Sequence, residues 1–77
     1  MQRTDVKSSN VKSIGYDPKN QILEVEFHNK SIYQYANVQK ELYKSLMASE
    51  SIGGFLHKNI IKKGFKAART DDEYTGG

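Results

Sequence analysis

The paired carboxylates Glu24 and Glu26 and the two histidines, His28 and His57, are the first candidates for catalysis or metal binding. Paired carboxylates can act as general acid and base, but Glu24 and Glu26 alternate with apolar residues, as on the exposed face of a strand. Neither histidine has a second histidine at a metal-binding spacing, or a carboxylate that the local sequence places beside it. We therefore expect surface histidines, no metal or cofactor, and a domain that is not an enzyme.

The stronger chemical feature is a run of positive charge near the C-terminal end. The net charge is +3 at pH 7, and residues 58–69 contain no acid. This basic segment consists of Lys58, Lys62, Lys63, Lys66 and Arg69. Clustered lysines suit phosphate binding, whereas cations at the end of a helix can simply complement its dipole. The five residues are candidate nucleic-acid contacts, and both interpretations stay open.

Tyr33 and Tyr35 form a second candidate surface, because they lie two residues apart in a strand-like stretch. On an open sheet they would stack nucleic-acid bases, a contact that contributes about 1–3 kcal/mol per base. Packed beneath helices, they would belong to the core instead. We favour the core, because aromatic side chains supply much of the burial available to a small domain.

Three strands are expected to position these residues, over residues 11–17, 21–27 and 31–36. Asp17 and Pro18 predict a turn after the first strand. The turn after Phe27 sets the register, because a slip of one residue reverses the direction of every side chain. A three-residue loop with a bulge would pair Phe27 with Ser31 and bring both tyrosines to the apolar face, and we favour that register.

Helical periodicity follows the strands. One helix is expected over residues 38–48, with Asn37 as its N-cap. A second is expected after Ser51, where apolar residues recur at helical spacing up to Ile60 and Gly64 suits the C-terminal cap. Gly53 and its neighbour Gly54 indicate a close approach of the backbone to another element. The predicted fold class is α+β, a three-stranded antiparallel meander followed by two helices packed on one face (β-β-β-α-α).

The 77 residues leave room for one domain, and the chain contains no cysteine. We expect a flexible leader over residues 1–8, the domain over residues 9–65 and a disordered tail over residues 66–77. The start of the chain lacks the apolar stretch of a signal peptide, and no run is long enough to span a membrane. The expected location is cytoplasmic.

An ordered set of positions across the expected domain resembles the KTSC domain family, which is named for a module at the C-terminus of some lysyl-tRNA synthetases and also occurs as small free-standing proteins of bacteria and phages. The positions are Ser9-Asn10, Ile14-Gly15-Tyr16-Asp17, Leu23-x-Val25-x-Phe27, Tyr33-x-Tyr35, Val38, Tyr43, Leu46, Ala48-Ser49, Ser51-x-Gly53-x-Phe55-Leu56-His57-x-x-Ile60 and Phe65.

The sequence departs from the family pattern at four positions. Lys30 stands where glycine is usual, Gln39 where proline usually follows Val38, His57 where asparagine is frequent, and Ile61 where a basic residue is common. Lys30 is therefore expected to adopt a left-handed conformation at some cost.

The resemblance implies a binding domain, and the association with a synthetase suggests RNA. The alternative is a protein-interaction module or accessory protein that uses an edge strand or an exposed apolar patch.

Overall fold

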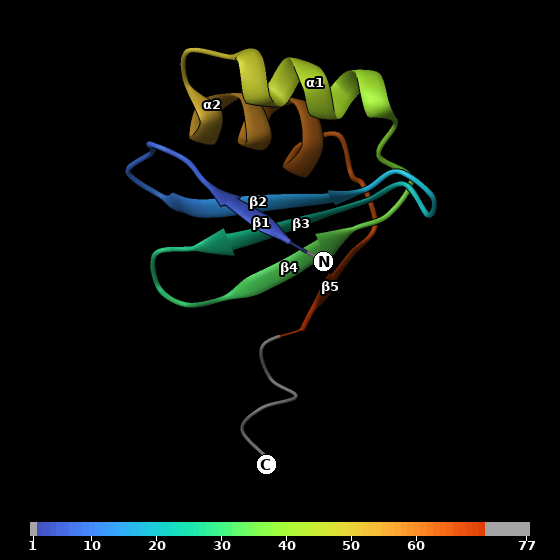
Figure 1. Cartoon of the computed structure of the whole chain (residues 1–77), viewed down its shortest axis with the longest axis horizontal. Coiled ribbons are helices and arrows are strands. Elements are labelled where there is room, and N and C mark those ends of the chain that lie inside the picture. Colours follow the sequence, from blue (N-terminus) through green and yellow to red (C-terminus); the bar gives the residue numbers. More distant parts are fainter. Residues whose placement is uncertain (1, 71–77) are drawn as a thin grey trace.

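The computed structural model describes residues 2–70, which form a sheet covered on one face by helices (Figure 1). The strands are β1 (Arg3–Asp5), β2 (Val11–Asp17), β3 (Ile22–Phe27), β4 (Ile32–Tyr35) and β5 (Ala67–Arg69). They pair antiparallel in the order β1-β2-β3-β4-β5. The helices are α1 (Lys40–Ala48), α2 (Ile52–Leu56) and the π-helical η1 (His57–Ile61) that continues it. The predicted α+β class, with its central meander followed by two helices, is confirmed.

The hairpin between β3 and β4 has the register predicted from the sequence. The backbone N–H of Phe27 donates to the Ser31 carbonyl over 2.9 Å, and the N–H of Lys30 donates to the Phe27 carbonyl over 2.9 Å. Tyr33 lies opposite Val25 and Tyr35 opposite Leu23, so all four side chains share the face beneath the helices. Lys30 has a φ of 74°, in the left-handed region, as expected.

The core lies between this sheet face and the helices. Its buried hydrophobic residues are Val11, Ile14, Leu23, Val25, Tyr35, Val38, Leu46, Ile52, Leu56 and Ile60. A register shift between Val11 and Ser13 in β2 lets Val11 and Ile14, three residues apart, face the same side. Tyr16 of β2 connects the sheet to the helical layer. Its ring stacks on Tyr43 of α1 at 4.6 Å, and its hydroxyl donates to the Val38 carbonyl over 2.6 Å.

The prediction of three strands was incomplete, because β1 and β5 extend the sheet at its two edges. β1 lies within residues 1–8, expected to be a flexible leader, and β5 lies within residues 66–77, expected to be disordered; residues 71–77 lie outside the described part of the chain. All the residues of both strands are exposed, so neither strand leaves an apolar pattern in the sequence. β5 is held largely by backbone pairing, and β1 by backbone pairing together with the contact between Arg3 and Glu24, neither of which the composition of a segment reveals.

Two details of the helices also differ from expectation. Asn37 is not the N-cap of α1: it has a φ of 64°, and Gln39 occupies the cap position without a side-chain hydrogen bond. The short polar side chain of asparagine suits a left-handed position as well as a cap. Ser51 does cap α2, accepting a hydrogen bond from the N–H of Gly54 over 3.3 Å. The wide turn of η1, in which the N–H of Lys62 donates to the His57 carbonyl over 2.8 Å, was not predicted.

Lys30→Gly is expected to stabilise the domain by about 0.5–1 kcal/mol. The left-handed region costs a non-glycine residue roughly 1–2 kcal/mol, of which part is offset by the greater freedom of glycine in the unfolded chain. Asn29→Gly is the matched control, because Asn29 does not have a positive φ and its Oδ1 accepts from the N–H of Ser31 over 3.0 Å. That variant should be destabilised. Urea denaturation measures both, and a Lys30→Gly protein less stable than the unsubstituted chain would contradict the expectation.

Asp17 provides a pH-dependent test of the turn after β2. Asn20 Nδ2 donates to one carboxylate oxygen over 2.9 Å, and the N–H groups of Lys19 and Asn20 donate to the other over 3.0 and 3.3 Å. The side-chain hydrogen bond from Asn20 is the main cause that holds the Asp17 pKa below its usual 3.8, with the backbone bonds adding to it. This contribution to stability is complete above the unfolded-state pKa and is lost as pH falls through the lower folded-state pKa.

Asn20→Ala should therefore raise the Asp17 pKa toward its usual value, and it should destabilise the domain more at neutral pH than in acid below that pKa. Carboxyl-carbon NMR titration measures the pKa directly. Lys19→Gln, which keeps the backbone N–H, serves as the control and should shift the Asp17 pKa much less. An Asp17 pKa that stays unchanged in Asn20→Ala would show that the side-chain bond does not form.

Candidate nucleic-acid interface and adjoining hollow

The five residues of the basic segment are all exposed, and they extend from the second helix past its end, as the sequence indicates. Lys58, Lys62 and Lys63 lie on η1 and the turn after it, within the helical layer. The chain then descends to the edge of the sheet, where Lys66 precedes β5 and Arg69 ends it (Figure 1). The positive charge therefore follows one side of the molecule from the helices down to the sheet edge.

The sheet face that the helices leave uncovered carries two carboxylates, of the buried Glu24 and of Glu26, that neighbouring side chains engage. Glu24 and Gln34 lie opposite each other there, and Gln34 Nε2 donates to Glu24 Oε1 over 2.8 Å. Arg3 of β1 pairs closely with Glu24 and lies 3.6 Å from Glu26 through its Nε. Ser13 also donates to Glu26, over 2.9 Å. Among residues 2–70, this face therefore presents neither free positive charge nor exposed aromatic rings to a phosphate backbone.

Tyr33 and Tyr35 lie on the opposite, helix-covered face. Tyr35 is 5% exposed and belongs to the core, while Tyr33 is half-buried beside it. Burial, with a smaller effect of Tyr33, raises the pKa of the Tyr35 hydroxyl above its usual value. The rings of Tyr33 and Tyr35 stack at 6.4 Å, and Phe27 meets Tyr33 edge-on at 5.9 Å. The pair is thus part of an aromatic row that ends at Phe27, rather than an open platform.

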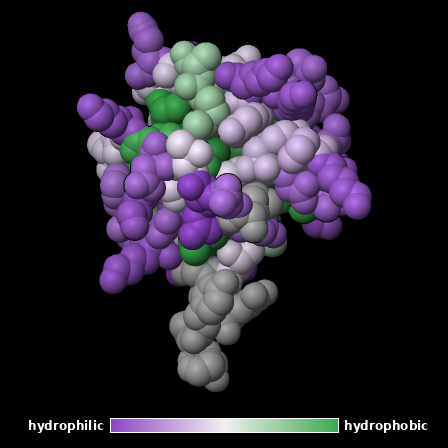
Figure 2. Space-filling model, viewed as in Figure 1, coloured by the Kyte–Doolittle hydropathy of each residue, from purple (hydrophilic) through white to green (hydrophobic). Residues whose placement is uncertain are grey.

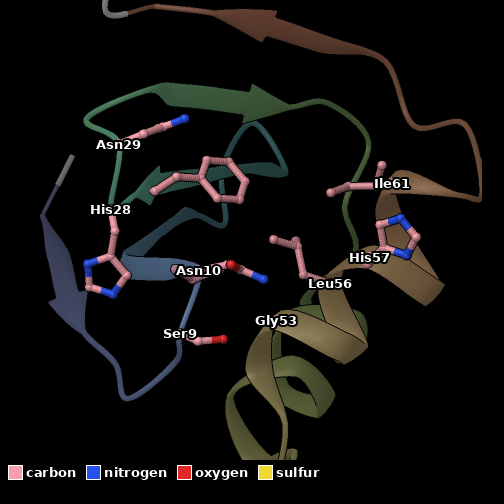
Figure 3. Close-up of a pocket in the computed structure, with 10 residues that line it drawn as sticks. Ser9, Asn10, His28, Asn29, Gly53, Leu56, His57 and Ile61 are labelled. Carbon is pink, nitrogen blue, oxygen red and sulfur yellow. The ribbon is translucent and has the colours of Figure 1, made fainter.

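Phe27 forms part of the wall of a hollow of about 430 Å³, which no spacing in the sequence had indicated. Three segments enclose this hollow: the loop before β2, the turn between β3 and β4, and the helix formed by α2 and η1 (Figure 3). The lining residues are Ser9, Asn10, Val11, Phe27, His28, Asn29, Gly53, Leu56, His57 and Ile61. Figure 2 shows hydrophobic atoms reaching an otherwise hydrophilic surface between α2 and the sheet.

Several polar groups around the hollow have no partner within the described part of the chain. The side-chain amide of Asn10 and the imidazole of His57 make no hydrogen bond there, and both residues are exposed. Asn29 uses its Oδ1 for the N–H of Ser31, which leaves its amide N–H groups. His28 holds the rim in place, because its Nε2 lies 2.9 Å from the Ser8 carbonyl oxygen. The hollow thus combines an apolar floor with donors and acceptors open to a ligand.

Gly53 brings the helix close enough to close one side of the hollow. A Cβ at this position would lie 3.1 Å from Ser8 Oγ, closer than an ordinary van der Waals contact. This is the close approach that the glycine pair predicted. Gly53, His57 and Ile61 follow one another at intervals of four along the helix face that lines the hollow, and Lys58 and Lys62 each stand one residue further along.

Apart from the glycine pair, the signal for this hollow was the family resemblance. Ser9, Asn10, Gly53 and Leu56 are positions on which that resemblance rests, and all of them line the hollow. Ser9 and Asn10 are polar and exposed, so burial in the core does not account for them.

Comparisons with known proteins agree with the sequence-based family. A family model described as the KTSC domain matches residues 7–65. An uncharacterized protein of Stutzerimonas stutzeri is 35% identical over 71 residues, which cover 92% of this chain and all of the relative. A protein of Tsukamurella paurometabola is 40% identical over 62 residues, 80% of this chain and 91% of the relative. The crystal structure of a KTSC domain protein from Yersinia pestis matches with a TM-score of 0.82 at 38% identity, covering 90% of this chain and 96% of that one.

Two further findings concern the described residues. Between residues 2 and 70, no three histidine, cysteine, aspartate or glutamate side chains gather in a way that would hold a metal ion. In the same part of the chain, no helix has both the length and the apolar character needed to cross a membrane.

Arg3→Gln is expected to destabilise the domain by about 1–3 kcal/mol, because it leaves the Glu24 carboxylate, whose side chain is 9% exposed, without its charged partner. Glu24→Gln in the same chain should restore part of that loss. Lys12→Gln is the control, since Lys12 lies 4.0 Å from Glu26 and is 55% exposed, and it should change stability by less than about 0.5 kcal/mol. Urea denaturation of the three variants tests this, and equal effects of Arg3→Gln and Lys12→Gln would show that β1 is not held by its arginine.

Proposed function

The chain belongs to the KTSC domain family, and we propose that it is a non-catalytic binding domain whose ligand is RNA. The contacts are made by the basic segment, Lys58, Lys62, Lys63, Lys66 and Arg69. RNA approaches along the side of the molecule where the second helix meets the β5 edge of the sheet. The phosphate backbone supplies most of the attraction, so binding is steeply dependent on salt.

The main support for RNA binding is that Lys58, Lys62 and Lys63 are exposed and form no ion pair within the described part of the chain. Arg3 and Lys12, by contrast, face carboxylates at the sheet. A lysine already paired with an acid would have to give up that partner to contact a phosphate, whereas a solvated lysine does not. The clustered lysines of the basic segment are therefore available to an anion.

The hydrogen bonds and ion pairs made by the two strand carboxylates support a non-catalytic role. Glu24 and Glu26, the only closely spaced carboxylates that suggested acid–base chemistry, are bound to Arg3, Ser13 and Gln34. His28 and His57 are exposed on the rim of the hollow, and neither forms a hydrogen bond with an acid or a hydroxyl in residues 2–70. The nucleophile–base pair that covalent catalysis requires is not assembled among these side chains.

A protein partner is the second candidate function, and the strand β5 favours it. β5 is an edge strand whose three residues are exposed, and because the backbone groups of an antiparallel edge strand alternate in direction, those of Ala67 are directed away from β4. An extended peptide can add to such an edge through main-chain hydrogen bonds. A partner bound in this way would persist at a salt concentration that releases RNA.

RNA binding predicts that the double variant Lys58→Gln/Lys62→Gln weakens the affinity for a short single-stranded RNA at low salt. It should also reduce the slope of log affinity against log salt by about 1.4, because each phosphate contact on a single strand contributes about 0.7. Fluorescence anisotropy with a labelled oligonucleotide measures both quantities, and a tRNA is titrated in parallel.

The matched control is Lys40→Gln/Lys44→Gln, which removes two exposed lysines at the same spacing from α1. This control should leave the slope within experimental error. Equal loss in the two double variants would indicate attraction to net charge alone and would contradict a site at the basic segment. If the unsubstituted chain failed to bind either RNA at low salt, the RNA proposal would be overturned and the β5 edge would be tested next.

A further inference from the structure

We propose that the hollow beside the second helix accepts one unstacked base of the bound RNA strand. This inference rests on the proposed RNA binding and adds to it a site that reads a base rather than the backbone. The lysines around the rim hold the phosphates on either side of that base. The occupant is thus a single nucleotide within a strand, inserted base-first between the helix and the β3–β4 turn.

The lining has the composition that base recognition needs. Phe27 and Ile61 supply an apolar surface above the buried Leu56, and Ile61, at 40% exposed, is the large hydrophobic residue that the fold leaves most accessible among residues 2–70. A base removed from a stack loses favourable contact with its neighbours, and aromatic or apolar side chains replace that contact. His57, which stands at the edge of the hollow across from Asn29 in Figure 3, adds a second ring that can stack.

Polar groups are placed to read the edge of such a base. Asn10 directs its amide into the space facing Leu56 in Figure 3, and that amide has both a free donor and a free acceptor within the described chain. Asn29 contributes amide N–H groups from the opposite turn. An amide can bond to a base edge through a donor and an acceptor together, and this pairing discriminates between bases.

The charges around the hollow favour an anionic occupant over a neutral one. No aspartate or glutamate is among the described residues that line it. Each of the three enclosing segments carries an exposed lysine within two residues of a lining residue: Lys7, Lys30, Lys58 and Lys62. None of the four pairs with an acid in the part of the chain that the structure describes. Positive charge on three sides of an acid-free hollow attracts a phosphate-bearing ligand.

The dimensions agree with one nucleotide. A hollow of about 430 Å³ is at the lower end of the range of roughly 300–1,000 Å³ that holds small molecules and cofactors. A base within a duplex cannot enter such a space, because its edges are paired and its faces are stacked. The hollow therefore selects single-stranded segments, loops and ends.

The test compares a labelled single-stranded oligoadenylate with an abasic oligomer of the same length and charge, both titrated by anisotropy at low salt. The intact strand should bind roughly five- to 150-fold more tightly, the range expected for one stacked base. Asn10→Ala/His57→Ala should lower the affinity for the intact strand toward that for the abasic one and leave abasic binding unchanged. Gln39→Ala, which removes an exposed amide on another part of the surface, is the control and should alter neither affinity.

An NMR titration with adenosine monophosphate tests the location of the base site independently. The side-chain N–H₂ signals of Asn10 and Asn29 and the ring signals of His57 should shift, while the amide signals of α1 should not. If the unmodified and abasic strands bound with equal affinity, and Lys58→Gln/Lys62→Gln still weakened binding, the base site would be overturned and RNA binding would stand. If neither strand binds, both proposals fail together.

Discussion

The packing of the core depends on the direction of the side chains on β4, and this direction is set by the three-residue turn between Phe27 and Ser31. In this register Tyr33 and Tyr35 join Leu23 and Val25 beneath the helices. The alternative two-residue turn would move both tyrosines to the face of Glu24 and Glu26. The chain accepts a left-handed Lys30 to form the longer turn, at roughly 1–2 kcal/mol. Burying even one large side chain contributes about 1.5–3 kcal/mol, so the gain across the face exceeds the local cost.

Much of the central fold follows from periodicity because burial leaves a periodic trace. Alternation in β3 and the helical spacing after Ser51 each mark a buried face, and the structure places those residues in the core. β1 and β5 leave no such trace, because they are exposed along their whole length. The contact that fastens β1, between Arg3 and Glu24, joins residues 21 positions apart and has no counterpart in local sequence. Asn37 illustrates a second limit, since one residue type serves both caps and left-handed turns.

The candidate site, like the fold, could be predicted from the sequence only in part. The basic segment could be identified because its members are close together in the chain, and charge needs no tertiary contact to be recognised. The hollow depends on Asn10, Asn29 and His57 meeting from three separate segments, which local patterns cannot show. Gly53 was the exception, because a glycine pair at the start of a helix is unfavourable unless the backbone must approach something. The structure identifies that neighbour as Ser8, in the loop that closes the hollow.

The uncovered face of the sheet and the surroundings of the hollow differ in how their charges are paired. On the uncovered face Arg3 is committed to Glu24 and Glu26, so the acids there are compensated and the arginine is not available. Around the hollow the lysines face solvent. At physiological ionic strength charges are screened beyond about 8 Å, so lysines distributed along the side of the molecule attract a strand only where it passes close to each of them. If RNA is the ligand, as we propose, capture of the backbone is spread over the basic segment, whereas the hollow, whose contacts are short-ranged, is the place where one base would be distinguished from another.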